Sequence, residues 1–181
     1  MVVATRLEAW AAGRLLPRHA VWRCGIGAGR LPGMDLAPLA ISCGLAAGLR
    51  PDLAPGAVLV PGAVSWLGRP HISCDLEMVA RLRDSAHRIG FEVVTDALVT
   101  VDGLVRGVDR GMWADQGYVG ADMETARLMG GGRRVAAVRI ILDTPVRELS
   151  IANGFWLARW GPVYARRAAA IVSGSGLVDR R

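Results

Sequence analysis

The sequence feature that most limits how this chain can fold is an apolar run that ends on a carboxylate. Val135–Leu142 has the composition of a buried strand, and Asp143 follows it directly. Shortly before this run, Ala121–Leu128 places Glu124 at the start of an expected helix. Strand ends and helix starts are the positions where α/β proteins assemble binding crevices outside their sheets. The two segments together therefore predict an α/β protein with a binding site.

The rest of the chain alternates between strand-like and helix-like patterns. This order predicts a three-layer α/β/α sandwich with a mixed central sheet. The length of 181 residues suits one domain with a substantial core, over residues 1–172, followed by a polar tail over residues 173–181. Strands are expected at Val2–Ala4, Ala20–Cys24, Leu39–Cys43, Ala57–Pro61, within Phe91–Val105 and at Arg134–Leu142; helices at Leu7–Leu16, Asp75–Gly90, Asp122–Met129 and Asn153–Val172; loops at Gly44–Gly56 and Gly111–Gly117.

Composition narrows the class of protein. Hydrophobic residues make up 52% of the chain and charged residues 21%, which is enough apolar material for a packed interior. The net charge of +6 comes from arginines that are dispersed without an aromatic-basic motif, so we expect no nucleic-acid partner. Neither a signal peptide nor a membrane span is evident, which predicts a cytoplasmic protein. Cys24, Cys43 and Cys74 lack CxxC spacing, which indicates reduced buried thiols and no metal site.

Three carboxylates are candidate site residues. Glu124 at the mouth of a sheet can accept hydrogen bonds from the 2- and 3-hydroxyls of a ribose, although it can equally be a first-turn charge after an Asp122 N-cap. Asp143, if desolvated, can have a raised pKa and protonate a leaving base, or it can start a turn before Pro145. Glu8 follows the first expected strand and is either an exposed helix residue or, as the family resemblance given below implies, a residue that positions a water or a sugar hydroxyl.

Two glycine-rich segments are candidate anion sites. Gly25 and Gly27 can offer backbone N–H groups to phosphate oxygens, and Arg30 can add charge, although a tight turn explains the same glycines. A dinucleotide fingerprint fails because its third glycine would fall at Arg30. Ser42 and Gly44 belong to a small-residue segment, and the family resemblance given below implies that phosphate and sugar lie under it.

Several of these segments together resemble the nucleoside phosphorylase and nucleosidase superfamily, and most closely its hopanoid-associated phosphorylases. The segments that carry the resemblance are Cys43–Leu53, Pro55-Gly56, Val119–Ala126 and Arg139–Pro145. The resemblance implies that Met123 packs on the ribose, Glu124 binds it and Asp143 protonates the departing purine. Inorganic phosphate is then the co-substrate, no cofactor is needed, and the substrate is a purine nucleoside or a nucleoside-lipid such as adenosylhopane.

The chain departs from that superfamily at defined positions. Leu142 replaces a serine that assists the aspartate, Leu45 replaces a common serine or threonine, and the region Leu31–Pro38 is shortened. Two alternatives therefore stay open: a purine nucleosidase that uses water, of the methylthioadenosine or futalosine type, and a nucleoside-binding protein without turnover. We also expect a homo-oligomer. Trp156, Trp160 and Tyr164 predict either a peripheral membrane contact or a helix packed on the sheet.

Overall fold

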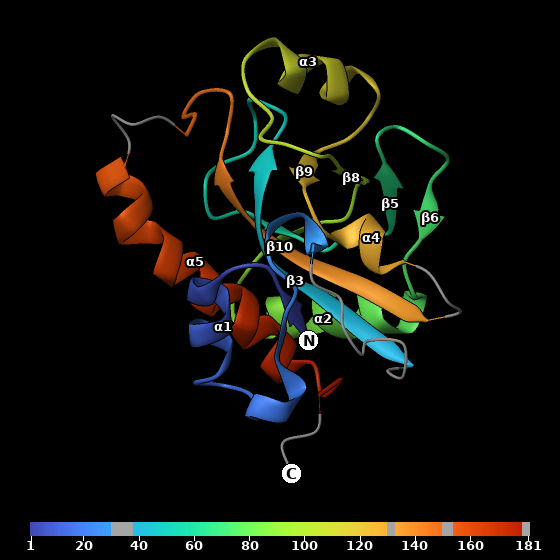
Figure 1. The fold of residues 1–181 in the computed structure, drawn as a ribbon, viewed down its shortest axis with the longest axis vertical. Coiled ribbons are helices and arrows are strands. Elements are labelled where there is room, and N and C mark those ends of the chain that lie inside the picture. The colour runs from blue at the N-terminus through green and yellow to red at the C-terminus, as the bar shows by residue number, and fades with distance from the viewer. Residues whose placement is uncertain (30–37, 130–132, 150–153, 179–181) are drawn as a thin grey trace.

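A mixed sheet of ten strands runs through the part of the molecule that this computed structural model describes, which is residues 1–29, 38–129, 133–149 and 154–178 (Figure 1). The strands are β1 (Val2–Val3), β2 (Trp22–Arg23), β3 (Leu39–Gly48), β4 (Val58–Leu59), β5 (Ala63–Trp66), β6 (Ile72–Ser73), β7 (Val93–Val94), β8 (Leu98–Thr100), β9 (Gly120–Asp122) and β10 (Arg134–Asp143). Their order is β6-β5-β8-β9-β3-β10-β4-β7, and β1 pairs with both β2 and β3.

Helices surround this sheet. They are α1 (Arg6–Ala12), α2 (Leu76–Arg88), α3 (Val108–Asp115), α4 (Thr125–Leu128) and α5 (Gly154–Gly174), with short 3-10 turns at Arg18–Ala20 and Ile26–Ala28. Helices α5 and α2 pack against β10, α5 also packs against β3, and α4 lies against β3, β5 and β8. The predicted α/β class with a mixed central sheet is confirmed.

The parallel pair β3 and β10 forms the centre of the sheet. Every residue of β10 after Arg134 is buried, which explains its nearly continuous apolar sequence. Glycines allow neighbouring chains to approach closely here. A Cβ on Gly48 would lie 2.9 Å from Ile141 Cγ2, and one on Gly120 would lie 2.8 Å from Leu59 Cδ2. The small residues 44–48, which we expected to begin a loop, therefore continue β3 instead.

Two other expectations about local structure are wrong. The segment Gly111–Gly117 was expected to be a loop, but most of it belongs to α3, whose start is set by Gly107 at a φ of +49°. Asp122 was expected to open a helix, but it ends β9, and α4 begins only at Thr125. Both errors arise because glycine content and helix-start residues are local signals, whereas pairing with a distant strand decides the outcome.

The C-terminal region also differs from its prediction. Helix α5 continues to Gly174, and Ser175 beyond it is buried, so residues 173–175 are ordered parts of the fold, while residues 179–181 lie outside the described residues. Tyr164 is buried, and Trp156 and Trp160 pack against the main core. The aromatic residues of this helix therefore cover the interior, which was the second of the two expectations for them.

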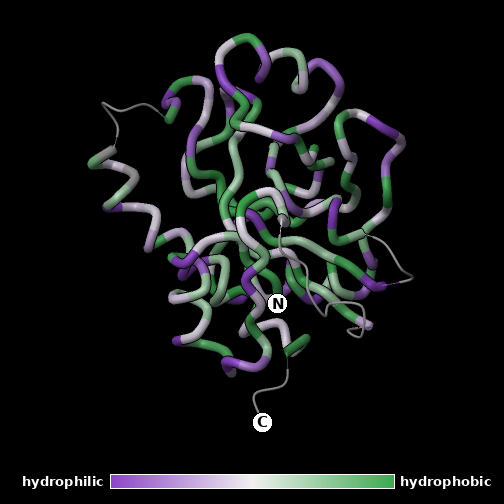
Figure 2. Tube along the Cα trace, viewed as in Figure 1, coloured by the Kyte–Doolittle hydropathy of each residue, from purple (hydrophilic) through white to green (hydrophobic). Residues whose placement is uncertain are grey.

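The surface and the core divide by hydropathy, with hydrophilic segments mainly at the periphery (Figure 2). Cys24, Cys43 and Cys74 are free and buried, as expected, and burial raises the pKa of the Cys43 thiol to about 12. Within the described residues, no helix is both long enough and apolar enough to span a membrane.

Candidate functional site

The site lies where two strands meet head to head along one edge of β3. Strand β10 occupies the other edge. On the free edge, β1 pairs in parallel at Ser42, and β9 pairs antiparallel at Ala47 and Gly48. The carboxyl ends of β1 and β9 therefore point toward each other, and the chain segments that follow them face the gap beside Leu45. Strand ends of this kind are where α/β folds place their ligands.

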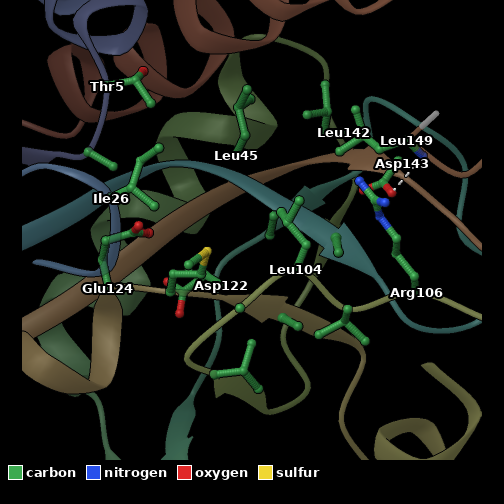
Figure 3. A pocket seen from close by; sticks show the side chains of 18 of the residues that line it. Thr5, Ile26, Leu45, Leu104, Arg106, Asp122, Glu124, Leu142, Asp143 and Leu149 are labelled. Atoms are coloured by element: carbon green, nitrogen blue, oxygen red, sulfur yellow. Dashed lines mark hydrogen bonds between the residues drawn. The ribbon is translucent and has the colours of Figure 1, made fainter. Parts of the chain in front are cut away.

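A cavity of about 280 Å³ occupies this junction (Figure 3). Its walls combine apolar side chains with the three predicted carboxylates, Glu8, Glu124 and Asp143. The figure shows Glu124 at one end and Asp143 at the other, with Leu45 and Leu104 between them. The lining residues are Ala4, Thr5, Glu8, Ile26, Leu45, Ala46, Ala47, Val101, Gly103, Leu104, Val105, Arg106, Ala121, Asp122, Met123, Glu124, Leu142, Asp143 and Leu149.

Glu8 reaches the gap because helix α1 starts directly after β1. Thr5 caps this helix and accepts a hydrogen bond from Glu8 N, while Glu8 Oε2 accepts from Thr5 N at 2.8 Å and from Ala4 N at 3.1 Å. Glu8 Oε1 accepts from Leu45 N at 3.0 Å, in the gap between β1 and β9. Glu8 is therefore a helix cap and a wall of the cavity at once, and only 6% of it is exposed.

An arginine that the sequence reasoning missed lies beneath this end of the cavity. Arg139, in the middle of β10, is 1% exposed. Its Nε donates to Asp122 Oδ2 at 2.9 Å, and its Nη2 donates to Ser42 Oγ at 2.7 Å and lies 3.6 Å from Glu124 Oε2. Burial lowers the pKa of Arg139, but the carboxylates of Asp122, Glu124 and Glu8 outweigh it and raise that pKa. One guanidinium therefore serves three carboxylates.

Glu124 stands at the start of α4 and is 8% exposed. Its Oε1 accepts a hydrogen bond from Gly27 N at 3.0 Å, which ties the loop after β2 to this end of the cavity. Burial raises the pKa of Glu124, Arg139 opposes that shift, and Asp122 adds to it. Met123 lines the cavity beside it. The residues predicted to bind ribose are thus brought together with Glu8.

Asp143 ends β10 at an irregularity in the sheet register, since Ile141 pairs with Ala46 and Asp143 with Ala47. Its carboxylate is 4% exposed and forms an ion pair with Arg110 of α3. Leu149 N donates to Asp143 Oδ2 at 3.1 Å. Burial raises the pKa of Asp143, whereas Arg110 and the Leu149 amide oppose the rise. This end of the cavity therefore holds a carboxyl group that can carry a proton more readily than an ordinary aspartate.

The residues predicted to bind phosphate lie in different surroundings. Gly25, Gly27, Ser42 and Gly44 are not among the lining residues of the cavity. Gly25 and Gly27 have φ angles of +79° and +69°, which glycine adopts without strain, and the Gly27 amide donates to Glu124. Ser42 accepts from Arg139, and Gly44 leaves room for Glu8 and Arg139. Arg30 lies outside the described residues, so the phosphate role of this set stays a prediction.

Sequence reasoning missed Arg139 and Arg110. A signal existed for Arg139, because a single charged residue inside an apolar strand must have buried partners. Arg110 had none, since its segment was not recognised as a helix. Within the described residues, no group of three or more His, Cys, Asp or Glu side chains is arranged to hold a metal ion.

Comparison with known proteins gives a match in structure only. No protein-family model and no curated protein matches the sequence. A Helicobacter pylori 5'-methylthioadenosine nucleosidase mutant, solved with 5'-methylthioadenosine in its active site, is similar at a TM-score of 0.79 and 14% identity, over 96% of this chain and 95% of that one.

Two further structures support the same likeness. Futalosine hydrolase of Helicobacter pylori matches at a TM-score of 0.78 and 15% identity, over 96% of this chain and 94% of that one. A 5'-methylthioadenosine/S-adenosylhomocysteine nucleosidase from Neisseria meningitidis matches at 0.78 and 14%, over 96% of both chains. At such identities the likeness establishes a shared fold, and the chain has the fold of these nucleosidases along almost its whole length.

Proposed function

We propose that this protein cleaves the N-glycosidic bond of a purine nucleoside and that water is the nucleophile. One observation carries the proposal: a single apolar cavity has Glu8 and Glu124 at one end and Asp143 at the other. Its position at converging strand ends, in a fold shared with several nucleosidases, supports the same conclusion. The proposed reaction is therefore hydrolysis, which was an alternative in the sequence analysis, and not the phosphorolysis expected there.

The acidic end suits the sugar. Breaking the bond between the base and C1′ leaves positive charge on the ribose, as in other glycosidic cleavages. Glu124 accepts hydrogen bonds from the ribose hydroxyls, and Met123 packs against the ring. The negative charge of Glu124 and Glu8 stabilises the cationic sugar as it develops, which is the kind of interaction that lowers a barrier most.

The opposite end suits the base. In its protonated form, Asp143 gives its proton to a ring nitrogen of the purine while the electron pair of the C–N bond leaves with the base. The burial that raises the pKa of Asp143 increases the fraction of this protonated form. Leu142 and Leu149, which lie beside Asp143 in Figure 3, offer apolar walls for a purine ring.

Water fits the acidic end better than phosphate does. An incoming phosphate dianion would meet Glu8 and Glu124, and the Gly27 amide that could have bound it already donates to Glu124. Water attacks C1′ and passes one proton to Glu8, which releases it to solvent, and Asp143 recovers its proton from solvent. The products are the free base and a ribose with a hydroxyl at C1′.

We further propose that the ribose carries an apolar group. Ile26 and Leu104 line the cavity and are nevertheless 67% and 65% exposed. Such exposed apolar side chains at a cavity mouth favour a ligand that covers them. A methylthio group meets this requirement, and so does the lipid of an adenosylhopane-like substrate.

Product analysis tests the reaction. The purified protein is incubated with adenosine or 5'-methylthioadenosine, with and without phosphate, and free base and sugar are quantified. We expect adenine and unphosphorylated sugar in both conditions, with faster cleavage of the alkylated nucleoside. Sugar 1-phosphate formed only with phosphate would establish phosphorolysis instead. Binding without any cleavage, unchanged in Asp143→Asn, would indicate a binding protein.

A further inference from the structure

A second buried arginine lies at the base end of the cavity and has no part in the reaction described so far. Arg110 of α3 is 1% exposed. Its Nη1 donates to the Gly48 carbonyl at 2.6 Å, its Nε donates to Glu148 Oε1 at 3.0 Å, and its Nη2 donates to Asp143 Oδ2. The guanidinium is thus fixed on three sides, and one of those sides is the candidate acid.

The bonds to Asp143 are unequal between its two oxygens. Oδ2 accepts from both Arg110 Nη2 and Leu149 N, whereas Oδ1 has no hydrogen-bond donor among the residues that the structure describes. Because the side chain lines the cavity, Oδ1 is the atom available to a bound base. The carboxyl group is therefore oriented by one oxygen and left with the other for chemistry.

We propose that Arg110 is a positioning residue that fixes the Asp143 carboxyl group through Oδ2 and sets the pH above which Oδ1 can no longer protonate the base. This inference rests on the proposed function, since it assigns how the proposed acid is held. The residue acts through Asp143 and contacts no substrate.

The charged groups around Asp143 predict the direction in which its pKa shifts when each of them is removed. Arg110 favours the ionised carboxylate and so lowers the pKa of Asp143, and Glu148, on the far side of Arg110, raises it. Arg106 lines the same cavity and extends toward its Asp143 end (Figure 3). Arg147 follows in the loop after β10, where its amide bonds to the Thr144 carbonyl. Removing Arg110 or Glu148 should therefore shift the titration of Asp143 in opposite directions.

The experiment is a set of pH–rate profiles for base release by the full chain. Arg110→Met is expected to move the alkaline limb to higher pH by about one to three units, the range for a nearby opposite charge, and to lower the maximal rate. Glu148→Gln is expected to move the limb to lower pH by less, because Glu148 acts across Arg110. Arg110→Lys, which keeps the charge, should keep the limb near its original pH. Arg81→Met, on the exposed face of α2, is the surface-charge control and should change nothing.

Each outcome decides one question. Limbs that coincide for the wild type, Arg110→Met and Glu148→Gln, or that shift in the same direction, would overturn the inference. Glu148 is 34% exposed, so Glu148→Gln keeps the test decisive if Arg110→Met does not fold. Asp143→Asn separates the two proposals. Full turnover in this variant would refute the proposed role of Asp143 itself. If Asp143→Asn is inactive but the alkaline limbs of Arg110→Met and Glu148→Gln stay at the wild-type pH, only the role of Arg110 is refuted.

Discussion

The two ends of the cavity use arginine in different ways. At the end proposed to bind the ribose, Arg139 is buried beneath the cavity and faces the carboxylates of Asp122, Glu124 and Glu8. At the end proposed to bind the base, Arg110 bridges Asp143 and Glu148. Negative charge is therefore in excess at the first end and closer to balance at the second. The first suits a sugar that becomes cationic, and the second suits a group that must gain and lose a proton.

The contrast shows two uses of a buried arginine: it can hold several carboxylates close together, or it can orient one carboxyl group and adjust its pKa. Carboxylates that share one guanidinium stay close together without being neutralised individually, which keeps a negative field at the sugar. A carboxylate that shares a guanidinium with only one other, as Asp143 shares Arg110 with Glu148, is fixed in orientation and has its acidity adjusted. The predictions below test this contrast, beginning with the largest effect.

Loss of the shared cation should have the greatest consequence. Arg139→Met leaves buried carboxylates without a counter-charge, and we expect the free energy of unfolding to fall by about 3–5 kcal/mol. Urea denaturation measures it. Arg134→Met in the same strand removes an exposed ion pair with Asp75 and serves as the matched control, with a much smaller change expected. Equal losses in both variants would show that Arg139 does not hold the ribose end together.

Loss of the negative charge of Glu124, the proposed ribose-binding residue, should reduce turnover more than stability. Glu124→Gln keeps the shape of the side chain but removes its negative charge, and we expect kcat to fall by about 100- to 1000-fold, as for removal of one transition-state contact. Steady-state base release measures it, with thermal unfolding as the check on folding. Glu77→Gln, at an exposed site on α2, is the control. An unchanged kcat would mean that Glu124 has only its structural role at the start of α4.

Crowding the ribose end should give an intermediate effect. A Cβ on Gly44 would collide with Glu8 Oε1 and lie 2.7 Å from Arg139 Nη1, so Gly44→Ala should cost about 1–3 kcal/mol and lower activity. Gly111→Ala in α3 meets nothing within 4 Å and should leave the protein equally stable or slightly more stable. Chemical denaturation of both variants provides the comparison, and an equally tolerated Gly44→Ala would argue against close packing of this cluster.

The smallest effect concerns stability against pH. The folded-state pKa of Glu124 is raised above 4.5, so between the unfolded and folded pKa values this carboxyl group holds more proton in the folded protein than in the unfolded chain. Its contribution to the free energy of unfolding therefore declines as the pH rises through 4.5 and reaches its lowest value above the raised pKa. Glu124→Gln lacks this decline, so its stability relative to wild type should increase from pH 4 to pH 7. A constant difference across this range would contradict the raised pKa.

Much of the fold could be predicted from sequence because its long elements have clear periodicity. The run that became β10 and the segment Asp75–Gly90 that contains α2 were both recognised, and Asp75 caps α2 by accepting from Met78 N at 3.0 Å. Strands β5, β6 and β9 were not predicted, because such short segments exist only through pairing with distant partners, whereas β7 and β8 lie within the predicted strand region Phe91–Val105.

The site was partly predictable for a related reason. Glu8, Glu124 and Asp143 follow strand ends, so a sequence pattern could nominate them, and the structure places all three on one cavity. Their catalytic and binding roles stay predictions. The partners of Arg139 and Arg110 could not be assigned from sequence, because the fold brings Asp122 and Asp143 to them across 17 and 33 residues.

The opposed ends of β1 and β9 have a consequence for how the site keeps its shape. Each of these strands pairs with β3 over only one or two residues, so either can separate from β3 at lower cost than the long β10 can. A nucleoside that contacts Glu8 and Glu124 together would join the two detachable strands through a single molecule. Occupancy of the cavity would thereby suppress local opening at both β1 and β9, so the site would be more rigid with a bound nucleoside than without one.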